Sequence, residues 1–571
     1  MLDSRIMNQN RRMITARRSL FVALLVASVL LGARVPAAAN PGLAGRPKLV
    51  VLIVVDQMRA DYLERFSADF QNGFKRLMKN GEWFTHAAYP YAKTVTCAGH
   101  STVSTGDFPS THGMINNSWW DRASGKTITC TGDPKTSLIV YGAAASSAAD
   151  AKSGESDWLM KAPSFAEQLR AQSAGSRVVT LSLKARAAIS MAGHGADSVT
   201  WLNGENWATS TAYGASPRPE IEAYVKSHSI KGEFGQVLTV PPEGGGTMAV
   251  VPGTAVSSAP WQRLPYDFAS PEQAIKSYEG WEASGFSDAY LEKLAEVEID
   301  KLRLGRGQGT DFLAISFSAL DIIGHAKGPD SRDVREILFL LDATLGKLFD
   351  ELDEHVGKGK WVVAITGDHG VARVPEIAAR AGVDAGRADV GELTASVTKA
   401  LEPFSGGDKP VAGFADGDIY FAAGIWDKIS VDPKALDAVF AAIRGVAGVA
   451  DVFRVDQLGG LADKNPLARA ALLSEFPGRG GDLFVITKPN WFFDRRDKSG
   501  GWGGGTTHGS PYPYDQRVPI ILMGAGIRAG KIAEAVTPAD IAPTFAELTG
   551  ITIARTDGHA LPVVGGAGKS R

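Results

Sequence analysis

Several features that point to common protein functions are absent from this sequence. No run of Lys and Arg occurs after the first eighteen residues, which argues against nucleic acid as a partner. No G-x-S-x-G motif is present, so the sequence does not fit a serine hydrolase with a nucleophile elbow. The glycine-rich stretch 500–509 (GGWGGGTTHG) lacks the Lys-Ser/Thr pair of a phosphate-binding P-loop. These absences leave other enzyme classes open.

Long apolar runs are also absent, with one exception near the N-terminus. The run LFVALLVASVLLGA (20–33) follows a cluster of arginines and precedes small residues that end at Ala39, which is typical of a signal peptide. At about 14 residues it is shorter than the roughly 20 that span a bilayer. We predict a signal peptide over 1–39, with an uncleaved anchor as the alternative, and therefore a periplasmic or secreted protein without a stable membrane anchor.

Cleavage at this position changes the charge balance. It removes six Arg and one Asp from the 60 basic and 62 acidic residues, which leaves a net charge of −7. The sequence therefore predicts a mildly acidic exported protein.

Cysteine is scarce, because only Cys97 and Cys130 occur. Such a pair often forms a disulfide in an oxidising compartment. Closing a loop of about 30 residues would stabilise the fold by roughly 3–4 kcal/mol. The pairing stays open at this point, because a sequence does not show whether two Cα atoms lie close enough.

The chain has 571 residues, of which 44% are hydrophobic and 21% charged. That length fits one large α/β domain with insertions, or two to four ordinary domains. Amphipathic helices are expected over 164–172 and 333–356. Runs rich in Val, Ile and Leu are typical of strands buried on both faces of a parallel sheet, at 48–55, 177–183, 311–320, 360–366 and 518–524. The alternation predicts a doubly wound, mostly parallel central sheet flanked by helices.

Two long stretches interrupt the alternation. Residues 190–305 are rich in Gly, Ser, Trp and Pro, and residues 375–490 mix short helices with Gly/Pro loops. We interpret both as cap-like insertions beside the site. The catalytic α/β domain would then consist of 40–189, 306–374 and 491–562, followed by a disordered tail over 563–571.

Aspartate and histidine residues stand where the predicted strands end. In open α/β sheets, ligands bind beyond the carboxyl ends of the strands, so these side chains should converge on one edge. A catalytic zinc needs about three protein ligands and an open position, and six ligands supply two zinc ions. Two metals roughly 4 Å apart can hold the attacking and leaving oxygens of an in-line displacement. The six candidates are Asp56, Asp321, His325, Asp368, His369 and His508.

Each of these residues has a plainer interpretation when taken alone. Asp56 could cap a helix, His325 could be a solvated loop residue, and Asp368 could form a turn. It is the series of motifs at four predicted strand ends that favours metal binding.

The stretch TVTCAGHSTVSTG (94–106) is dense in hydroxyl groups and becomes compatible with a helix at about Cys97. A hydroxyl at a helix N-terminus lies beside unpaired backbone N–H groups, where phosphate binds well. A metal beside it would lower the pKa of the hydroxyl and make it a nucleophile. These arguments do not separate Thr94 from Thr96.

Taken in order, the motifs resemble the alkaline phosphatase superfamily, over essentially the whole chain after the predicted signal peptide. Phosphodiesterases of that superfamily carry a loop P-x-K-T-x-P-N-H, whose nucleophilic Thr lies four residues before the His. The resemblance therefore implies that Thr96, four residues before His100, is the nucleophile. It also implies a division of ligands between two zinc ions: Asp56, Thr96, Asp368 and His369 on one, and Asp321, His325 and His508 on the other. The C/S-x-P-x-R form of sulfatases is absent.

Within the superfamily, SLKARAAI (182–189) resembles the S-x-K-x-R-x-A-I motif of PhoK/PafA-type bacterial alkaline phosphatases. In that group the Lys, the Arg and an Asn bind phosphate oxygens, which here implies Lys184, Arg186 and Asn117. Asn116 adjoins Asn117, and the family's pattern around MINNSWW favours Asn117. A phosphate monoester is a dianion, so two cations beside two zinc ions match its charge.

The expected activity is that of a zinc-dependent alkaline phosphatase that hydrolyses small phosphate monoesters through a phosphothreonine. One alternative is a phosphodiesterase or nucleotide pyrophosphatase of the same superfamily. The other is a non-catalytic surface protein that binds metal or phosphate. Additional structural Ca²⁺ is compatible with the Asp-rich loops, although the sequence does not place it.

Overall fold

The computed structural model describes residues 45–142, 153–234, 237–239, 249–251, 278–405 and 409–563. The predicted signal peptide lies outside the described residues, and so do residues 564–571 of the predicted tail. Within the described part, none of the helices combines the length and the apolar character that crossing a membrane requires.

The largest sheet in the described residues has eleven strands, in the order β21-β2-β20-β13-β1-β12-β7-β8-β9-β5-β6. Its outer strands include β21 (Gly530–Val536), β2 (Glu82–Ala87), β5 (Gly132–Val140) and β6 (Ser153–Glu155). Its centre is parallel, because β1 (Leu49–Val55) pairs in parallel with both β12 (Asp311–Phe317) and β13 (Trp361–Thr366). β12 continues in parallel to β7 (Val178–Ser182), and β7 to β8 (Ser198–Asn203). The prediction of a doubly wound, mostly parallel sheet is confirmed for this centre.

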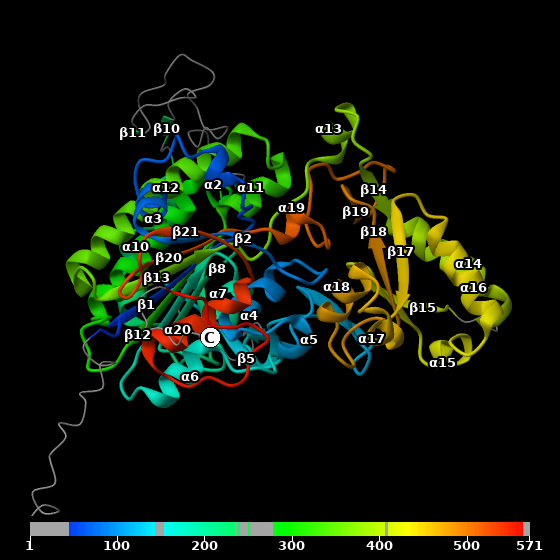
Figure 1. Ribbon diagram of the computed structural model, residues 1–571, viewed down its shortest axis with the longest axis horizontal. Helices are drawn as coiled ribbons and strands as arrows, with labels where there is room; N and C mark the ends of the chain where they lie inside the picture. Colours follow the sequence, from blue (N-terminus) through cyan, green and yellow to red (C-terminus); the bar gives the residue numbers. More distant parts are fainter. Residues whose placement is uncertain are drawn as a thin grey trace, which may run out of the picture. The chain divides into compact units, whose positions relative to one another are not determined.

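Helices cover both faces of the central sheet. Alternate residues of β1 enter two separate apolar cores, with Leu49 and Val51 in one and Val50 and Leu52 in the other. The first core includes side chains of α3 (Gly73–Asn80), α10 (Gly285–Lys301) and α12 (Arg332–Leu352). The second includes side chains of α4 (Thr96–Thr105), α6 (Phe165–Gln172) and α20 (Ile541–Thr549). Figure 1 shows these three helices on the opposite side of the sheet from α3, α10 and α12. A strand buried on both sides has no polar face, which explains its continuous apolar sequence.

The two amphipathic helices predicted from spacing correspond to α6 and α12. Ser164 caps α6 in a capping box, since its side chain accepts from the backbone N–H of Glu167 and the Glu167 carboxylate accepts from the N–H of Ser164. α12 ends at Leu352, before the predicted limit at 356, and a π-helical turn covers Asp353–Gly357.

One strand runs against the expected direction. The run 518–524 contains β20 (Ile520–Gly524), which pairs antiparallel with β13. The prediction that this run belongs to the parallel set is therefore wrong. Because β20 is reversed, its amino end lies at the same sheet edge as the carboxyl end of β13, so His508, which precedes β20, still reaches that edge.

The stretches predicted as insertions differ in the structure. β8 and β9 (Asn206–Ser210), which lie inside 190–305, extend the central sheet, and α10 packs in its core. Residues within 375–490 instead form a four-stranded sheet of their own, in the order β15-β16-β18-β17, with an apolar core that includes Leu393 and Val439. Its strands are β15 (Val411–Ala415), β16 (Asp418–Phe421), β17 (Val449–Arg454) and β18 (Leu483–Thr487).

Candidate two-metal site

The six predicted ligands converge on one edge of the central sheet. Asp56 follows β1 directly, and Asp368 with His369 follows β13 after one intervening residue. Asp321 and His325 lie one turn apart on α11 (Ala319–Lys327), which begins just after β12. His508 lies in the loop before α19 (Pro513–Gln516) and β20. Each ligand is thus held at the end of a buried strand or in a segment anchored to one.

Three of these side chains form one candidate metal group: Asp321, His325 and His508. The Nε2 atoms of His325 and His508 lie 3.2 Å and 3.8 Å from Oδ1 of Asp321. The spacing D-x-x-x-H places the first two ligands on the same face of α11, as neighbours one helical turn apart. One carboxylate and two imidazoles with an open side form a ligand set that zinc accepts.

A second group joins Asp56, Asp321 and His369. Nε2 of His369 lies 3.4 Å from Oδ1 of Asp56 and 3.3 Å from Oδ2 of Asp368. The structure therefore places Asp321 within reach of both groups, whereas the predicted division gave it to one. Asp368 also borders the second group, since its Oδ2 lies next to Nε2 of His369.

All three histidines have the same orientation. The Nδ1 atoms of His325, His369 and His508 lie 2.8, 3.0 and 2.7 Å from the backbone oxygens of Thr506, Gly370 and Thr94. A carbonyl oxygen only accepts, so Nδ1 carries the proton and donates it. Each Nε2 is then left unprotonated and faces the centre, which is the usual arrangement of a metal-binding histidine.

Buried atoms without partners test whether this site suits a metal. Oδ1 of Asp56, Oδ2 of Asp368 and Nε2 of His369 are buried and make no hydrogen bond in the described structure. Unpaired buried polar atoms are rare and costly, and three of them facing one another fit a shared cation. Both candidate groups of Asp and His found in the described residues lie at this centre, and the additional Ca²⁺ stays a prediction without a location.

The electrostatics of the centre also favour a cation. Burial raises the pKa of Asp56, and the neighbouring charges of Asp321 and Asp368 raise it further. Burial lowers the pKa of His508 and of His369, which keeps these imidazoles neutral and able to bind metal. The site thus concentrates negative charge and keeps His369 and His508 uncharged, whereas the neighbouring charge of Asp321 raises the pKa of His325 despite its burial.

Lys184 supplies one positive charge at this point. It is the residue before α7 (Ala185–Ala192), and its Nζ lies 2.5 Å from Oδ2 of Asp56 and also contacts Oδ2 of Asp321. Burial would lower the pKa of Lys184, but Asp321 and Asp56 raise it above its usual value. Arg186 lies in the first turn of α7, and its Nε is buried without a hydrogen-bond partner in the described structure. The motif SLKARAAI thus brings a cation to the ligands themselves.

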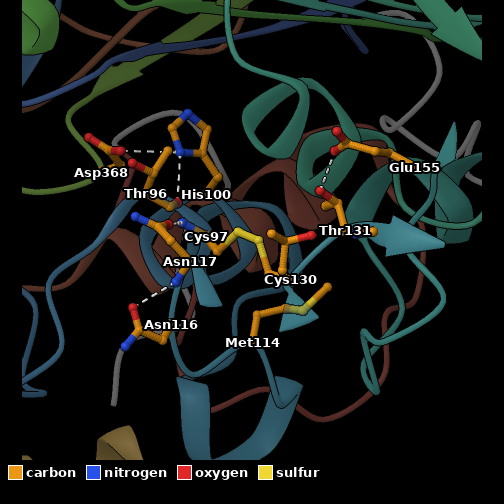
Figure 2. Close-up of a disulfide and its surroundings, with 12 residues drawn as sticks. Thr96, Cys97, His100, Met114, Asn116, Asn117, Cys130, Thr131, Glu155 and Asp368 are labelled. Atoms are coloured by element: carbon orange, nitrogen blue, oxygen red, sulfur yellow. Dashed lines mark hydrogen bonds and ion pairs between the residues drawn. A yellow bond between two sulfur atoms is a disulfide. The ribbon is translucent and has the colours of Figure 1, made fainter. Parts of the chain in front are cut away.

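Thr96 is the first residue of α4, so its hydroxyl lies at the positive end of that helix, one residue earlier than the predicted start. Gly99 lets α4 approach the metal ligands closely, since a Cβ there would lie 2.2 Å from the backbone oxygen of Asp368. His100 spans the same contact, with Nδ1 2.9 Å from the carbonyl of Thr96 and 3.2 Å from Oδ2 of Asp368 (Figure 2).

Asn117 is tied to the same helix. Its Oδ1 accepts from the backbone N–H of Cys97 at 2.9 Å, and its own N–H donates to Oδ1 of Asn116 at 2.7 Å (Figure 2). Cys97 and Cys130 form a disulfide beside this contact. The segment that contains Asn117 is thereby held next to the N-terminus of α4.

Two further residues at the site carry no signal that the sequence analysis used. Gln57, between Asp56 and Met58, hydrogen-bonds two predicted ligands. Lys93, just before the hydroxyl-rich stretch, is fully buried and pairs with Asp418 at 2.6 Å. The sequence signal that could have identified Lys93 is its position directly before the candidate nucleophile loop.

Comparison with known proteins adds independent evidence about the family of this chain. The pattern of the family described as type I phosphodiesterase / nucleotide pyrophosphatase matches residues 50–511, a span that contains every predicted ligand. The chain belongs to this family. Its predicted resemblance to the alkaline phosphatase superfamily is thereby confirmed.

Members with known names resemble the chain over most of its length. It is 29% identical over 555 residues to alkaline phosphatase PafA of Elizabethkingia meningoseptica, which covers 94% of this chain and 96% of that protein. It is 30% identical over 552 residues to alkaline phosphatase PhoK of a Sphingomonas species, which covers 91% of this chain and 92% of the relative. The crystal structure of wild-type alkaline phosphatase PafA superimposes with a TM-score of 0.78 at 27% identity, covering 91% of this chain and 99% of the other.

Proposed function

We propose that this protein is an exported alkaline phosphatase that hydrolyses phosphate monoesters through a phosphothreonine at Thr96. The observation that carries the proposal is the convergence of three histidine Nε2 atoms and unpaired carboxylate oxygens beside the N-terminus of α4. Relatives that are alkaline phosphatases over most of the chain support the phosphomonoesterase activity. The disulfide supports export, because disulfides persist in oxidising compartments.

Two zinc ions are part of the proposal. Asp56, Asp368 and His369 would hold one of them together with Thr96, and the second would be held by Asp321, His325 and His508, with Asp321 near both. Bound there, the ions would lower the pKa of the hydroxyl group and offset negative charge on phosphate and leaving group.

The residues of the chain carry out the steps. The hydroxyl of Thr96 gives up its proton to water, and Oγ1 attacks phosphorus and forms the new O–P bond. The bond to the alcohol oxygen breaks on the opposite side, and that oxygen takes up a proton from water. A water molecule then attacks the phosphothreonine, which releases phosphate and restores the hydroxyl of Thr96. The positive end of the α4 dipole faces the phosphate in both steps.

Lys184, Arg186 and Asn117 would hold the remaining phosphate oxygens. A monoester brings two negative charges to the site and a diester brings one. Additional cations therefore favour the monoester, and a guanidinium suits phosphate geometry. The contact of Lys184 with both Asp56 and Asp321 supports this role, because it places the ammonium group between the two ligand groups.

The experiment compares kcat/KM for one monoester and one diester with the same aryl leaving group, in the wild type and in Lys184→Ala. We expect the monoester value to fall about 10²-fold or more and the diester value to fall clearly less, since one charge-assisted contact at a transition state is worth a few kcal/mol. Lys161→Ala serves as the matched control on an exposed lysine and should leave both values unchanged. Equal losses for the two substrates would refute the charge-matching argument.

A phosphodiesterase is the second candidate, because the matched family is described by that activity. A wild-type kcat/KM that is higher for the diester than for the monoester would establish it in place of the first proposal.

The insertion reaches the site from one side. Asp416 and Phe484, from the four-stranded sheet, line a cavity of about 40 Å³ together with His508. That volume holds a few water molecules rather than an aromatic leaving group. Residues of the insertion are therefore proposed to border the leaving group at the mouth of the site without enclosing it.

A further inference from the structure

Gln57 has an unusual backbone conformation at the centre of the site. Its φ is +67°, in the left-handed region that few residues other than glycine adopt, and its side chain is fully buried. It directly follows Asp56, a predicted ligand. Residues held in such conformations persist only where the surrounding structure fixes them, and they cluster at functional sites.

The left-handed turn allows Gln57 to donate in two directions. Its backbone N–H donates to Oδ1 of Asp368 at 3.0 Å, and its side-chain Nε2 donates to Oδ1 of Asp321 at 2.7 Å. These two carboxylates were predicted for different metals. Gln57 is therefore a direct bridge between ligands of the two groups.

The oxygens that Gln57 contacts explain how it would orient the ligands. On Asp368 it binds Oδ1, which leaves Oδ2 directed at His369, 3.3 Å away. On Asp321 it binds Oδ1, the oxygen next to His325, while Oδ2 faces Lys184. Each carboxylate is thus held at a set rotation before any metal binds.

The packing of the Gln57 amide also explains why the D-I-I-G-H motif contains a glycine, Gly324. A Cβ on Gly324 would lie 1.8 Å from Oε1 of Gln57 and 2.9 Å from its Cδ. Helix α11 packs against the amide at this point, and only glycine leaves room. Gln57 therefore contacts the Asp321 side chain and the helix that carries it.

We propose that Gln57 is a positioning residue that aligns the two metal sites, holding Asp368 through its backbone and Asp321 through its side chain. The inference rests on the proposed two-metal function. It makes an asymmetric prediction, because a substitution removes the side-chain bond and retains the backbone bond. The site of Asp321, His325 and His508 should lose metal affinity, and the site of Asp56, Asp368 and His369 should keep it.

The test measures zinc binding to the metal-free protein by calorimetry, in the wild type, Gln57→Asn and Gln57→Gly. Asn tolerates positive φ better than most residues, but its amide is one methylene short of Asp321. Glycine removes any backbone strain together with the amide. We expect two zinc ions in the wild type, and in both variants one site weakened about 10–100-fold with the other changed less than about threefold.

A control variant and a second test variant allow the positioning role to be tested even if the Gln57 variants do not fold. Arg303→Gly changes an exposed residue at φ +53°, far from the predicted ligands in the sequence, and should leave both zinc affinities unchanged. If the Gln57 variants do not fold, as judged by circular dichroism of the metal-free protein, Gly324→Ala displaces the same amide from the other side. It should cause the same selective loss.

Unchanged affinities at both sites, or equal losses at both, would overturn the positioning role, and so would a wild type that binds fewer than two zinc ions. A wild type that binds two zinc ions but hydrolyses no monoester refutes the proposed function alone, because the selective loss of zinc is measured without substrate.

Discussion

Thr94 and Thr96 have different environments although only one residue separates them. The hydroxyl of Thr94 is buried and donates to the backbone oxygen of Ser510 at 3.2 Å, while the carbonyl of Thr94 accepts from His508. Thr96 is the first residue of α4, so its hydroxyl lies at the positive end of that helix. The hydroxyl and carbonyl of Thr94 are thus both engaged in holding the loop, which supports the proposal that Thr96 is the nucleophile.

Substitution of the two threonines tests that choice. Thr96→Ala should lower kcat for a monoester by about 10³-fold or more, because no other nucleophile replaces it, whereas Thr96→Ser should retain measurable turnover. Thr94→Ala should change kcat less than about tenfold and lower the unfolding free energy by about 1 kcal/mol, through the lost hydrogen bond. Steady-state kinetics and urea denaturation of the three variants check this, and near wild-type kcat in Thr96→Ala would refute the assignment.

For single residues, the sequence predicts which side chains form the site better than it predicts how they are divided between the two metal groups. Asp56, Asp368 and His369 could be predicted because each follows a buried apolar strand. That Asp321 lies near both groups depends on how far α11 leans toward the other strands. Gly324 lets α11 approach Gln57 closely, and this packing joins positions far apart in the sequence.

At the scale of elements, a buried charge cluster connects the nucleophile loop to the insertion. Nζ of Lys93 lies 2.6 Å from Oδ2 of Asp418 and 2.5 Å from Oε1 of Glu475, and all three side chains are almost inaccessible to solvent. Ser474 adds hydrogen bonds from the backbone N–H groups of Ala92 and Lys93. The segment that leads into α4 is therefore anchored on the four-stranded sheet and its neighbouring helix.

This cluster predicts a pH dependence of stability. Burial, together with the charge of Asp418, raises the pKa of Glu475 to about 8. The folded protein then holds a proton on Glu475 between about pH 4.5 and 8, which the unfolded chain releases, so the unfolding free energy should fall as the pH rises through that window. The slope from this group is at most about 1.4 kcal/mol per pH unit.

Glu475→Gln stays uncharged at every pH and should remove this slope. Urea denaturation at several pH values between 5 and 8 measures the difference, with the exposed Glu392→Gln as a matched control. If wild type and Glu475→Gln lose stability in parallel, the carboxyl group does not titrate in the folded state as described.

The direction of a strand is harder to predict from the sequence than the presence of the strand. The apolar run of β20 predicts a buried strand, but nothing in its composition distinguishes parallel from antiparallel pairing with β13. The hairpin of β15 and β16 carried a usable signal, since Asp416 and Gly417 both have positive φ, as a two-residue type I′ turn requires. Asp-Gly between short apolar runs is the sequence pattern of such a turn.

At the scale of the whole molecule, the central strands were predictable because burial on both faces leaves them uniformly apolar. The outer strands were not. β8 and β9 are short, contain Thr and Asn, and stand in a stretch otherwise rich in Gly and Ser, so composition favoured an insertion there. The region 375–490 does form a separate sheet and core, and it contacts the α/β domain at Lys93, three residues before Thr96.

The central claim is that two zinc ions at this sheet edge are needed for monoester hydrolysis. The direct measurement is the metal content of the purified protein together with its monoester turnover, before chelation, after chelation and after zinc is returned. The account predicts two zinc ions per chain, loss of turnover when they are removed and recovery when they are restored. Full turnover in a protein shown to contain no metal would contradict it.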